Sequence, residues 1–467
     1  MDVKYKKLGK NTALVFLGGA SSKIVNFVML PLYTRWLSVS EYGLADIITV
    51  YATLLLGVVA CCIYDAVFVL PKRDSVKSQT EYFSSAIGFV VFTSIVTAIL
   101  FYIISKVSIC AGLDGAFFSH IWLIYALLIP EIIFKVLQQF CRCINKMVIF
   151  SISGIFVTLG TALLSFWFIP LYGVFGYITS MSLSYIFATV LVVYLCKTYQ
   201  YFNINMVLSN RLREMLTYSI PLIPNALMWW LVDALNRPMM EKFVGLSGIG
   251  IYAVANKFPG LLSLINSSFM TSWQISVLDE FGKPNYNDFY NKIFRLTVVS
   301  LSIFLIVITL SSETLIRLFA TQDYYSAWKL VPLLTFGVLF SNVSGFVGCN
   351  FSAAKESKYY FYSSVWGAII AIIFNIIFIP FWGIWGAAIT SLLSFIMMTL
   401  SRLYYSWKYA RISSANLYLF LFVMDLLFII LVVSEINFII SMIIAMCLII
   451  IHLYSIRNIL KLSRFLR

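Results

Sequence analysis

The sequence predicts an all-α polytopic membrane protein of about fourteen transmembrane helices, built as two parallel six-helix repeats and a C-terminal helix pair. Three observations lead to this prediction. The composition is 61% hydrophobic and 11% charged, which leaves too little polar surface to cover a water-soluble protein of this length. Long apolar runs recur between short, often basic segments. The stretch IPLYGVFG at 169–176 is also closely repeated as IPFWGIWG at 379–386.

Each predicted span is an apolar run of about 20 residues, long enough to cross the hydrocarbon core of a bilayer as a helix. A transmembrane β-barrel would show alternating polar and apolar residues instead. The amino end has the composition of a signal peptide but lacks a small-residue cleavage site, so we expect it to be retained as the first span. The predicted spans are 12–33, 43–70, 83–105, 117–138, 148–169, 172–196, 215–236, 247–275, 293–312, 326–351, 360–380, 383–406, 416–433 and 437–455.

The internal repeat groups these spans into lobes. Two sets of residues recur at nearly the same offset in the two halves of the chain. This recurrence indicates that spans seven to twelve repeat spans one to six. Six is an even number, so both units enter and leave on the same side, as parallel repeats about an axis along the membrane normal. The predicted domains are 1–205, 206–410, and 411–467 with two extra spans and a basic tail. The matches are Ile169, Pro170, Gly173 and Gly176 with Ile379, Pro380, Gly383 and Gly386, and Pro31, Ser40 and Gly43 with Pro238, Ser247 and Gly250.

The repeat has two interpretations. Duplication retained for close helix packing would give the same pattern of glycines and prolines. Two similar lobes about one axis are also the usual machinery of alternating-access carriers, which hold the ligand between the lobes near the midplane.

Positive charge is distributed unevenly between the predicted loops. Most of the 33 Lys and Arg residues fall in segments that are cytoplasmic when the amino end is inside. This bias predicts both termini in the cytoplasm, and it accounts for most of the net charge of +14 without nucleic acid as a partner. The external loops hold only Arg35, Lys106, Arg237, Lys242, Arg317 and Lys329.

Cysteine and histidine usage argues against metal and redox chemistry. The eight cysteines are scattered, mostly within spans or on the predicted cytoplasmic side, which does not suggest a disulfide framework. His120 and His452 are the only two histidines, so we do not expect histidine-based catalysis or metal binding. We expect no cofactor and no metal; a coupling proton or sodium ion remains open.

Three stretches resemble one family of membrane carriers. In order and position they are similar to the polysaccharide-flippase branch of the multidrug/oligosaccharidyl-lipid/polysaccharide exporter superfamily, over about residues 8–410. The last two spans resemble the extra pair of fourteen-span members. The stretches are WLSVSEYGLADIIT (36–49), YSIPLIPNALMWWLVDALNRPMM (218–240) and FVGLSGIGIYAVANKF (243–258).

The resemblance implies a flippase of the bacterial inner membrane. Such a carrier moves an undecaprenyl-pyrophosphate-linked oligosaccharide from the cytoplasmic to the outer leaflet, for capsule, O-antigen or related polymers. It implies two six-helix lobes with a central cationic cavity. Its partners would be the lipid-linked oligosaccharide and the membrane, with a polymerase and chain-length machinery as further candidates.

Charged residues inside spans are the candidate site, because such a charge tends to face a cavity, a partner or the interface. Lys23 and Lys257 lie near mid-depth in spans one and eight, and we interpret them as a pyrophosphate site. The alternative is that they pair with Asp46, Asp65 or Asp233.

The other charged residues have weaker or structural interpretations. Arg35 and Arg237 end equivalent spans, and either bind the substrate or extend to the external headgroups. Glu131 and Lys135 are four residues apart and share a helix face, where pairing is favoured. A proton or sodium ion could bind Asp46, Asp65 or Asp233 and reset the carrier. Asp425 lies outside both repeats, where helix contacts are the simpler role.

Two other function classes fit the sequence less well than a carrier does. A membrane-embedded glycosyltransferase or polysaccharide polymerase needs positioned acids or bases, usually on sizeable external loops. The largest external segment, 311–327, offers only Glu313 and Asp323. A cation-coupled multidrug exporter would need an acidic pocket, whereas Lys23 and Lys257 make this one basic. We therefore expect a carrier and not an enzyme.

Overall fold

The computed structural model describes residues 24–71, 75–207 and 210–463. No strand occurs in these ranges, which confirms the predicted all-α fold. Within them, ten helices are long and apolar enough to cross a membrane, or eleven when the bent pair Gly245–Leu264 and Phe269–Glu280 counts as one span. The chain is therefore a multi-pass membrane protein. The expected first span, 12–33, falls mainly outside the described residues, so the count of fourteen stays a prediction.

The chain divides into two compact units. Unit 1 comprises Met1–Trp230 and Val244–Gly250, and unit 2 comprises Leu231–Phe243 and Ile251–Arg467. The first contains the helices α2 to α9 and most of α10, together with the start of α12. The predicted lobes 1–205 and 206–410 remain predictions, because the units group the chain by contacts and not by repeats. The helices of unit 1 are α2 (Leu30–Trp36), α3 (Val39–Val59), α4 (Ile63–Val69), α5 (Val76–Ala111), α6 (Ala116–Ser119), α7 (Ile121–Cys143), α8 (Met147–Cys196), α9 (Arg211–Ser219) and α10 (Ile223–Asp233).

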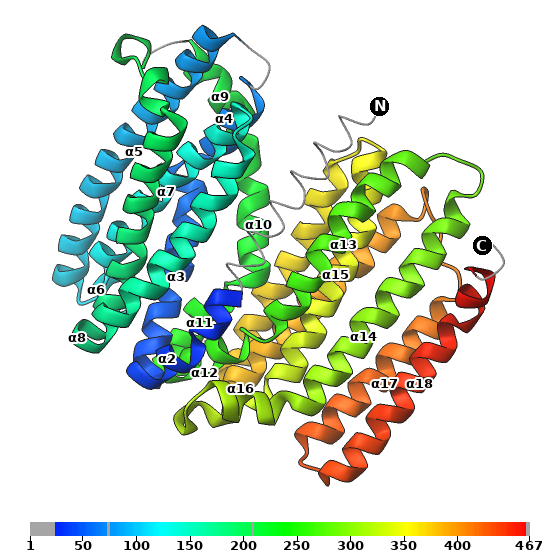
Figure 1. Ribbon diagram of the computed structural model, residues 1–467. Helices are drawn as coiled ribbons and strands as arrows, with labels where there is room; N and C mark the ends of the chain where they lie inside the picture. The colour runs from blue at the N-terminus through cyan, green and yellow to red at the C-terminus, as the bar shows by residue number, and fades with distance from the viewer. Residues whose placement is uncertain (1–23, 72–74, 208–209, 464–467) are drawn as a thin grey trace. The chain divides into compact units, whose positions relative to one another are not determined.

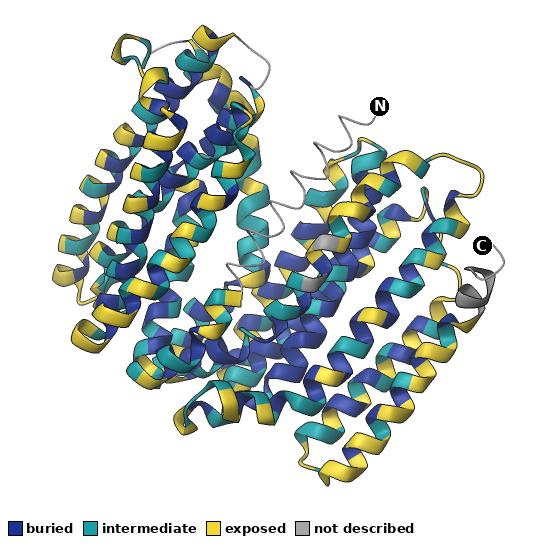
Figure 2. Ribbon diagram, viewed as in Figure 1, coloured by how far each residue is buried: buried dark blue, intermediate teal, exposed yellow. Residues whose placement is uncertain are grey.

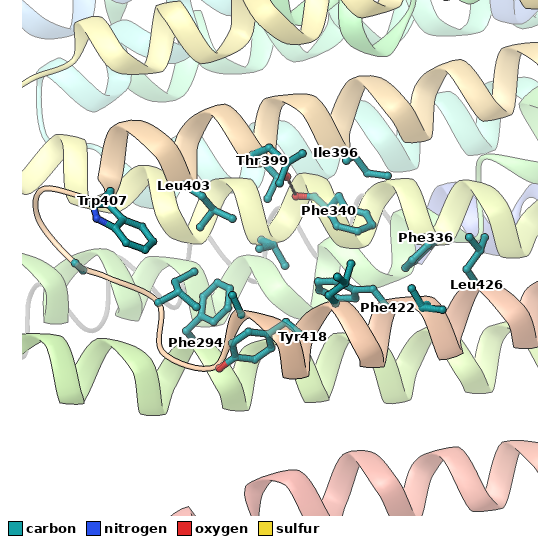
Figure 3. Close-up of a pocket in the computed structure, with 17 residues that line it drawn as sticks. Phe294, Phe336, Phe340, Ile396, Thr399, Leu403, Trp407, Tyr418, Phe422 and Leu426 are labelled. Atoms are coloured by element: carbon teal, nitrogen blue, oxygen red, sulfur yellow. Dashed lines mark hydrogen bonds between the residues drawn. The ribbon is translucent and has the colours of Figure 1, made fainter.

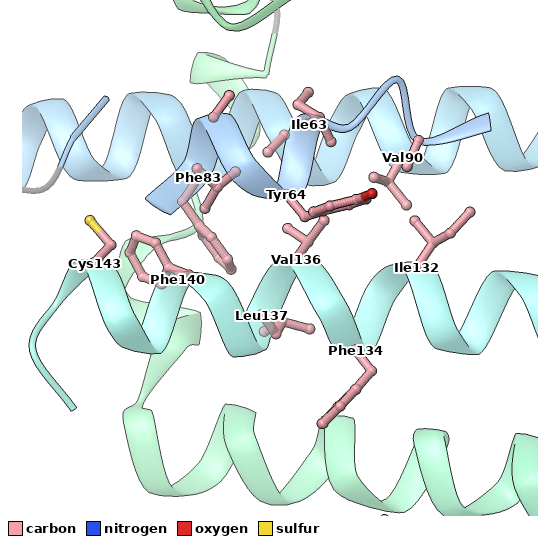
Figure 4. Packing of buried hydrophobic residues seen from close by; sticks show 14 of the residues in the cluster. Ile63, Tyr64, Phe83, Val90, Ile132, Phe134, Val136, Leu137, Phe140 and Cys143 are labelled. Carbon is pink, nitrogen blue, oxygen red and sulfur yellow. The ribbon is translucent and has the colours of Figure 1, made fainter. Parts of the chain in front are cut away.

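The core of unit 1 forms around α7, which packs against α3, α4, α5 and α8. Its apolar residues recur every three or four positions and therefore face one side of the helix. Figure 4 shows Phe140 of α7 beside Phe83 of α5, and these rings stack with centroids 4.3 Å apart. Other members of the cluster that the figure labels are Ile63, Tyr64, Val90, Ile132, Phe134, Val136, Leu137 and Cys143.

The predicted span 43–70 is broken in the structure. The first part, α3, begins at a capping box in which the Ser38 hydroxyl accepts from the backbone N–H of Glu41, and the Glu41 carboxylate accepts from Ser38 N at 2.9 Å. It ends at Val59 because Cys61 and Cys62 adopt left-handed backbone angles, with φ of 47° and 50°. The chain then resumes as α4, with Asp65 in its first turn.

The repeated turn is a hairpin with the same geometry in both halves. α8 and α16 (Lys358–Ser406) each consist of two helices joined at a glycine. Gly173 has φ 55° and ψ −130°, and Gly383 has φ 54° and ψ −128°, a conformation that side chains disfavour. A Cβ at Gly176 or Gly386 would also overlap a carbonyl oxygen, of Phe168 or Phe378 respectively. Both positions therefore require glycine.

The second sequence match is a close crossing inside unit 1. A Cβ at Gly43 would overlap the carbonyl oxygen of Leu246, and one at Gly250 would overlap that of Val39. The hydroxyls of Ser40 and Ser247 lie 2.7 Å apart at the same crossing. Small residues at equivalent positions of the two repeats thus let their backbones approach closely.

Unit 2 is organised around α15, in which 72% of the residues of the most apolar 18-residue stretch are buried. It packs against α13, α14 and α16, and the Trp273 and Phe346 rings stack between α13 and α15 at 4.2 Å. Figure 1 shows α17 and α18 side by side along α14, and Figure 2 shows their outward faces as exposed. The helices that lie wholly or partly in unit 2, besides the end of α10, are α11 (Asn236–Phe243), α12 (Gly245–Ala255), α13 (Pro259–Glu280), α14 (Tyr286–Phe319), α15 (Val331–Ala353), α16, α17 (Ala415–Val433) and α18 (Phe438–Ser463).

Candidate functional site

Unit 1 holds a cluster of two acids and two bases between α4 and α7. We call Asp65, Glu131, Lys135 and Arg142 the unit 1 charge cluster. Asp65 interacts electrostatically with Lys135 and Arg142, and Glu131 interacts with Lys135. The hydroxyl of Tyr185, on α8, donates a hydrogen bond to Glu131. The formal charges of the four members cancel, as burial among apolar helices favours.

Aromatic rings complete this cluster. The Lys135 Nζ lies 4.7 Å from the ring centroid of Tyr64, and the Arg142 guanidinium carbon lies 4.0 Å from that of Phe68. Such cation–π contacts stabilise a charge that has left bulk water. The break before α4 places Asp65 in the first turn of that helix. On α7, the four-residue spacing of Glu131 and Lys135 puts them on one helix face.

Unit 2 holds a network around Arg237, which is 5% exposed. Its Nη1 donates to the Asp233 carbonyl, and to the Asn236 Oδ1 at 2.9 Å. The guanidinium also lies 4.9 Å from the ring centroid of Tyr252. The Asn236 amide in turn donates to the hydroxyls of Tyr252, at 2.8 Å, and Ser391, at 3.1 Å. Arg237 is therefore fixed inside its unit rather than extended toward headgroups.

Lys257 lies at a helix break. α12 ends at Ala255 and α13 begins at Pro259, so Lys257 belongs to the intervening turn. Its side chain is half-buried. Within unit 2, as far as its residues are described, no acidic side chain forms an ion pair with it. A lysine held at a break in a span is well placed to meet an anion.

Of the remaining predicted residues, Asp233 contacts the Arg237 network through its backbone carbonyl. Lys23 lies outside the described residues. Arg35 is exposed in the last turn of α2, Asp46 is half-buried on α3, and Asp233 is exposed at the end of α10. Asp425 is buried on α17, where its Oδ1 lies 3.4 Å from the Nε2 of His452.

Sequence reasoning missed two arginines that pack inside the units, the half-buried Arg142 and the buried Arg402, because both fall near the ends of predicted spans and look like cytoplasmic charges. Arg142 joins the unit 1 charge cluster. Arg402, 1% exposed, donates to the Ser363 hydroxyl at 3.1 Å and to the Ser344 carbonyl at 3.0 Å. Its guanidinium also lies 5.2 Å from the ring centroid of Tyr360. For Arg402, the hydroxyl residue Ser363 within the adjacent apolar span was the available signal.

Unit 2 also contains an apolar cavity of about 420 Å³, bounded by α14, α15, α16 and α17 (Figure 3). The Thr399 hydroxyl, one of its few polar groups, is occupied by a hydrogen bond to the Phe340 carbonyl at 2.9 Å. No charged side chain lines it, so it suits a hydrocarbon chain and not a headgroup. Its lining includes Phe294, Phe336, Leu403, Trp407, Phe422 and Leu426.

Comparisons with known proteins place this fold. The lipid II flippase MurJ, in an inward closed conformation, is 16% identical with a TM-score of 0.69, over 97% of this chain and 99% of that chain. A Vibrio cholerae MATE transporter, VcmN, is 12% identical with a TM-score of 0.58, over 86% of this chain and 96% of that chain. A transporter of the MOP superfamily from Pyrococcus furiosus is 14% identical with a TM-score of 0.57, over 86% of this chain and 96% of that chain.

A family model gives the relationship by sequence. Residues 8–274 match the model described as "Polysaccharide biosynthesis protein". Curated protein sequences gave no significant match. The solved structures establish the fold, and the family model covers more than half of the chain, which confirms the resemblance seen in the sequence. This protein therefore belongs to the polysaccharide biosynthesis protein family, and its fold is the one shared by the flippase MurJ and the MATE transporters.

Proposed function

We propose that this protein is a flippase that moves an undecaprenyl-pyrophosphate-linked oligosaccharide from the cytoplasmic to the outer leaflet by alternating access. The polymer would be a capsule, an O-antigen or a related cell-surface polysaccharide. The observation that carries the proposal is the duplicated hairpin at Gly173 and Gly383, which has the same backbone angles in a chain of this family. A duplicated fold supplies two similar halves that can exchange conformations.

The chemistry of such a substrate matches features of the chain. A pyrophosphate cannot leave water without cations and hydrogen-bond donors, because an unpaired anion in a low-dielectric site is very costly. Lys257, at its helix break, is the described cation that best suits this role, and Lys23, Arg35 and Arg237 are further candidates. The apolar cavity of unit 2 is of a size and character that suits part of a polyprenyl chain.

The membrane potential offers a driving force. A lipid pyrophosphate carries roughly two negative charges, and each is worth about 2.3 kcal/mol per 100 mV. With both termini in the cytoplasm of a bacterial inner membrane, the potential favours outward passage of the anion. Asp46, Asp65 or Asp233 would then take up a proton or a sodium ion while the empty carrier returns.

Replacement of Lys257 tests the pyrophosphate site. In proteoliposomes that contain a fluorescent undecaprenyl-pyrophosphate oligosaccharide, Lys257→Gln should slow headgroup translocation about tenfold or more, because it removes a charge-assisted hydrogen bond. Lys257→Arg should retain more activity than Lys257→Gln. Lys242→Gln, which removes an exposed lysine of α11, is the matched control and should leave the rate unchanged.

The outcomes separate the site from the function. Normal translocation by Lys257→Gln would remove this lysine from the mechanism but leave the flippase proposal intact. Failure of the wild-type protein to move any lipid-linked oligosaccharide would overturn the function itself. Export of a cationic dye by such an inactive protein would instead support the multidrug exporter.

A further inference from the structure

A buried acid and a buried histidine face each other in the C-terminal helix pair, outside both repeats. Asp425 of α17 and His452 of α18 each have side chains with 0% exposure, and the Asp425 Oδ1 lies 3.4 Å from the His452 Nε2. Within the described residues, neither carboxylate oxygen nor Nε2 has a well-aligned hydrogen-bond partner. A buried ionisable pair of this kind is costly in apolar helices.

A third polar group lies at the same level. Ile306 of α14, Phe428 of α17 and Leu448 of α18 pack in one apolar cluster. Asp425 precedes Phe428 by about one helical turn, and His452 follows Leu448 by about one turn. Ser302 lies one turn before Ile306 on α14. Its buried hydroxyl is also without a hydrogen-bond partner in the part of the chain that the structure describes.

The contacts of the imidazole fix how many protons the pair must carry. The His452 Nδ1 lies 2.8 Å from the Leu448 carbonyl, which can only accept, so Nδ1 carries a hydrogen. In a neutral ring Nε2 is then a lone pair, and it would face a carboxylate that offers only lone pairs. One more proton between Nε2 and the Asp425 carboxylate removes this repulsion and makes the pair neutral overall.

We propose that Asp425 and His452 form a binding site for a single proton that holds α17 and α18 together. Loss of this proton leaves an uncompensated carboxylate among apolar helices, which is strongly unfavourable unless the helices separate and admit water. Proton release is therefore coupled to loosening of the helix pair. Because α17 also lines the apolar cavity of unit 2, loosening would alter that cavity.

Other ionisable groups on the neighbouring helices lie at the edge of this site. On α14, the Arg295 Nη1 lies 3.4 Å from the Ser455 carbonyl, about one turn from His452, and Nη2 lies 3.5 Å from the Ser414 hydroxyl. Arg295 also interacts electrostatically with Tyr418 of α17. On α15 the one titratable side chain is Cys349, which interacts with Tyr286 and Tyr290 instead. The positive charge of Arg295 favours an ionised Asp425 carboxylate, whereas complete burial of that carboxylate opposes its ionisation.

The chain has only two histidines, so a His120→Gln variant carries one reporter imidazole. In nanodiscs, nitrogen NMR of this ¹⁵N-histidine-labelled protein should show a protonated Nδ1 at neutral pH. Infrared difference spectra against Asp425→Asn should show which partner holds the second proton: a neutral carboxyl with a neutral ring, or a carboxylate with a cationic ring. Either distribution supports the proposal. A carboxylate beside a neutral ring, or an unprotonated Nδ1, would overturn it.

Thermal stability provides the second measurement. The melting temperature of the wild-type protein should fall by a few degrees between about pH 6 and about pH 9, because the proton is lost at high pH. Asp425→Asn should abolish this dependence, since its amide donates to Nε2 and cannot ionise. Glu435→Gln, at the exposed end of the same hairpin, should keep the wild-type profile.

A second variant keeps the test possible if Asp425→Asn does not fold. If Asp425→Asn does not accumulate, the double variant Asp425→Asn/His452→Gln replaces the pair with two amides that can hydrogen-bond to each other. Its melting temperature should also be independent of pH over the same interval. A wild-type slope that persists in the variants would place the titrating group elsewhere and refute the site.

Discussion

The two hairpins of α8 and α16 are nearly the same, whereas the buried charges of the two units differ. Gly173 and Gly383 share their φ and ψ within a few degrees. In unit 1, acids and bases lie together in the charge cluster of α4 and α7. In unit 2, Arg237 and Arg402 are bound by carbonyls, an amide, a hydroxyl and aromatic rings.

This difference indicates what duplication preserves. A backbone with positive φ tolerates almost nothing but glycine, so both copies keep the residue. A charge in a membrane helix only needs some partner, and different side chains can supply one. The repeats therefore keep a common backbone frame while the polar side chains inside them differ.

The largest expected effect comes from valine at the hairpin glycines. Gly173→Val and Gly383→Val each force a β-branched residue into a strained backbone conformation, at a cost of about 1–3 kcal/mol or more. We expect both variants to lose most of their accumulation in membranes, and to similar degrees, as measured by fluorescence-detected size exclusion.

The neighbouring exposed residues Leu171 and Phe381, at 71% and 81% exposure, are the matched controls. Leu171→Ala and Phe381→Ala should accumulate normally. Tolerance of valine at one hairpin but not at the other would break the equivalence of the two halves.

An intermediate effect is expected in the unit 1 charge cluster. Asp65→Asn leaves Lys135 and Arg142 with less compensation, and the half-buried position suggests a loss of about 1–2 kcal/mol in stability. The double variant Asp65→Asn/Lys135→Gln restores neutrality and should recover part of that loss. Melting temperatures of the single and double variants in detergent measure this coupling.

Glu280→Gln, which removes one half of an exposed pair with Lys283, should change the melting temperature little. If the double variant were as unstable as the sum of its single variants, the cluster would consist of independent charges. The contrast with unit 2 would then lose its basis.

The smallest effect is expected at a surface pair of unit 2. The pKa of Glu356 is lowered to about 2, mainly because its carboxylate accepts hydrogen bonds from the Lys408 ammonium group. A lowered pKa stabilises the fold above the ordinary pKa of the acid, and this contribution is lost as the pH falls toward about 2. Between about pH 5 and pH 8 it should therefore be constant.

Glu356→Gln should lower the melting temperature at neutral pH by at most about a degree, because exposed ion pairs contribute little. The difference from wild type should shrink further in acid or at high salt. A loss as large as that of Asp65→Asn would mean that surface and interior charges contribute alike.

The sequence by itself determined the class of protein and its duplication. A composition so apolar admits only membrane helices, since each helix satisfies its own backbone hydrogen bonds in lipid. Gly173 and Gly383 mark the repeat in the sequence because each turn requires glycine at that position. The requirement depends on local backbone conformation, so the residue type alone records it. Gly43 and Gly250 also match in the sequence, and each is required because the two backbones approach closely where they cross.

Only the tertiary structure decided which charges lie together. Arg142 and Arg402 look like cytoplasmic charges in the sequence, and Asp65 looks like part of an unbroken span. Their partners come from other helices, and no local pattern specifies how helices far apart in the chain are rotated and set against each other. Likewise, nothing in the sequence around Asp425 indicates His452, because only the packing of α17 beside α18 brings these two residues together.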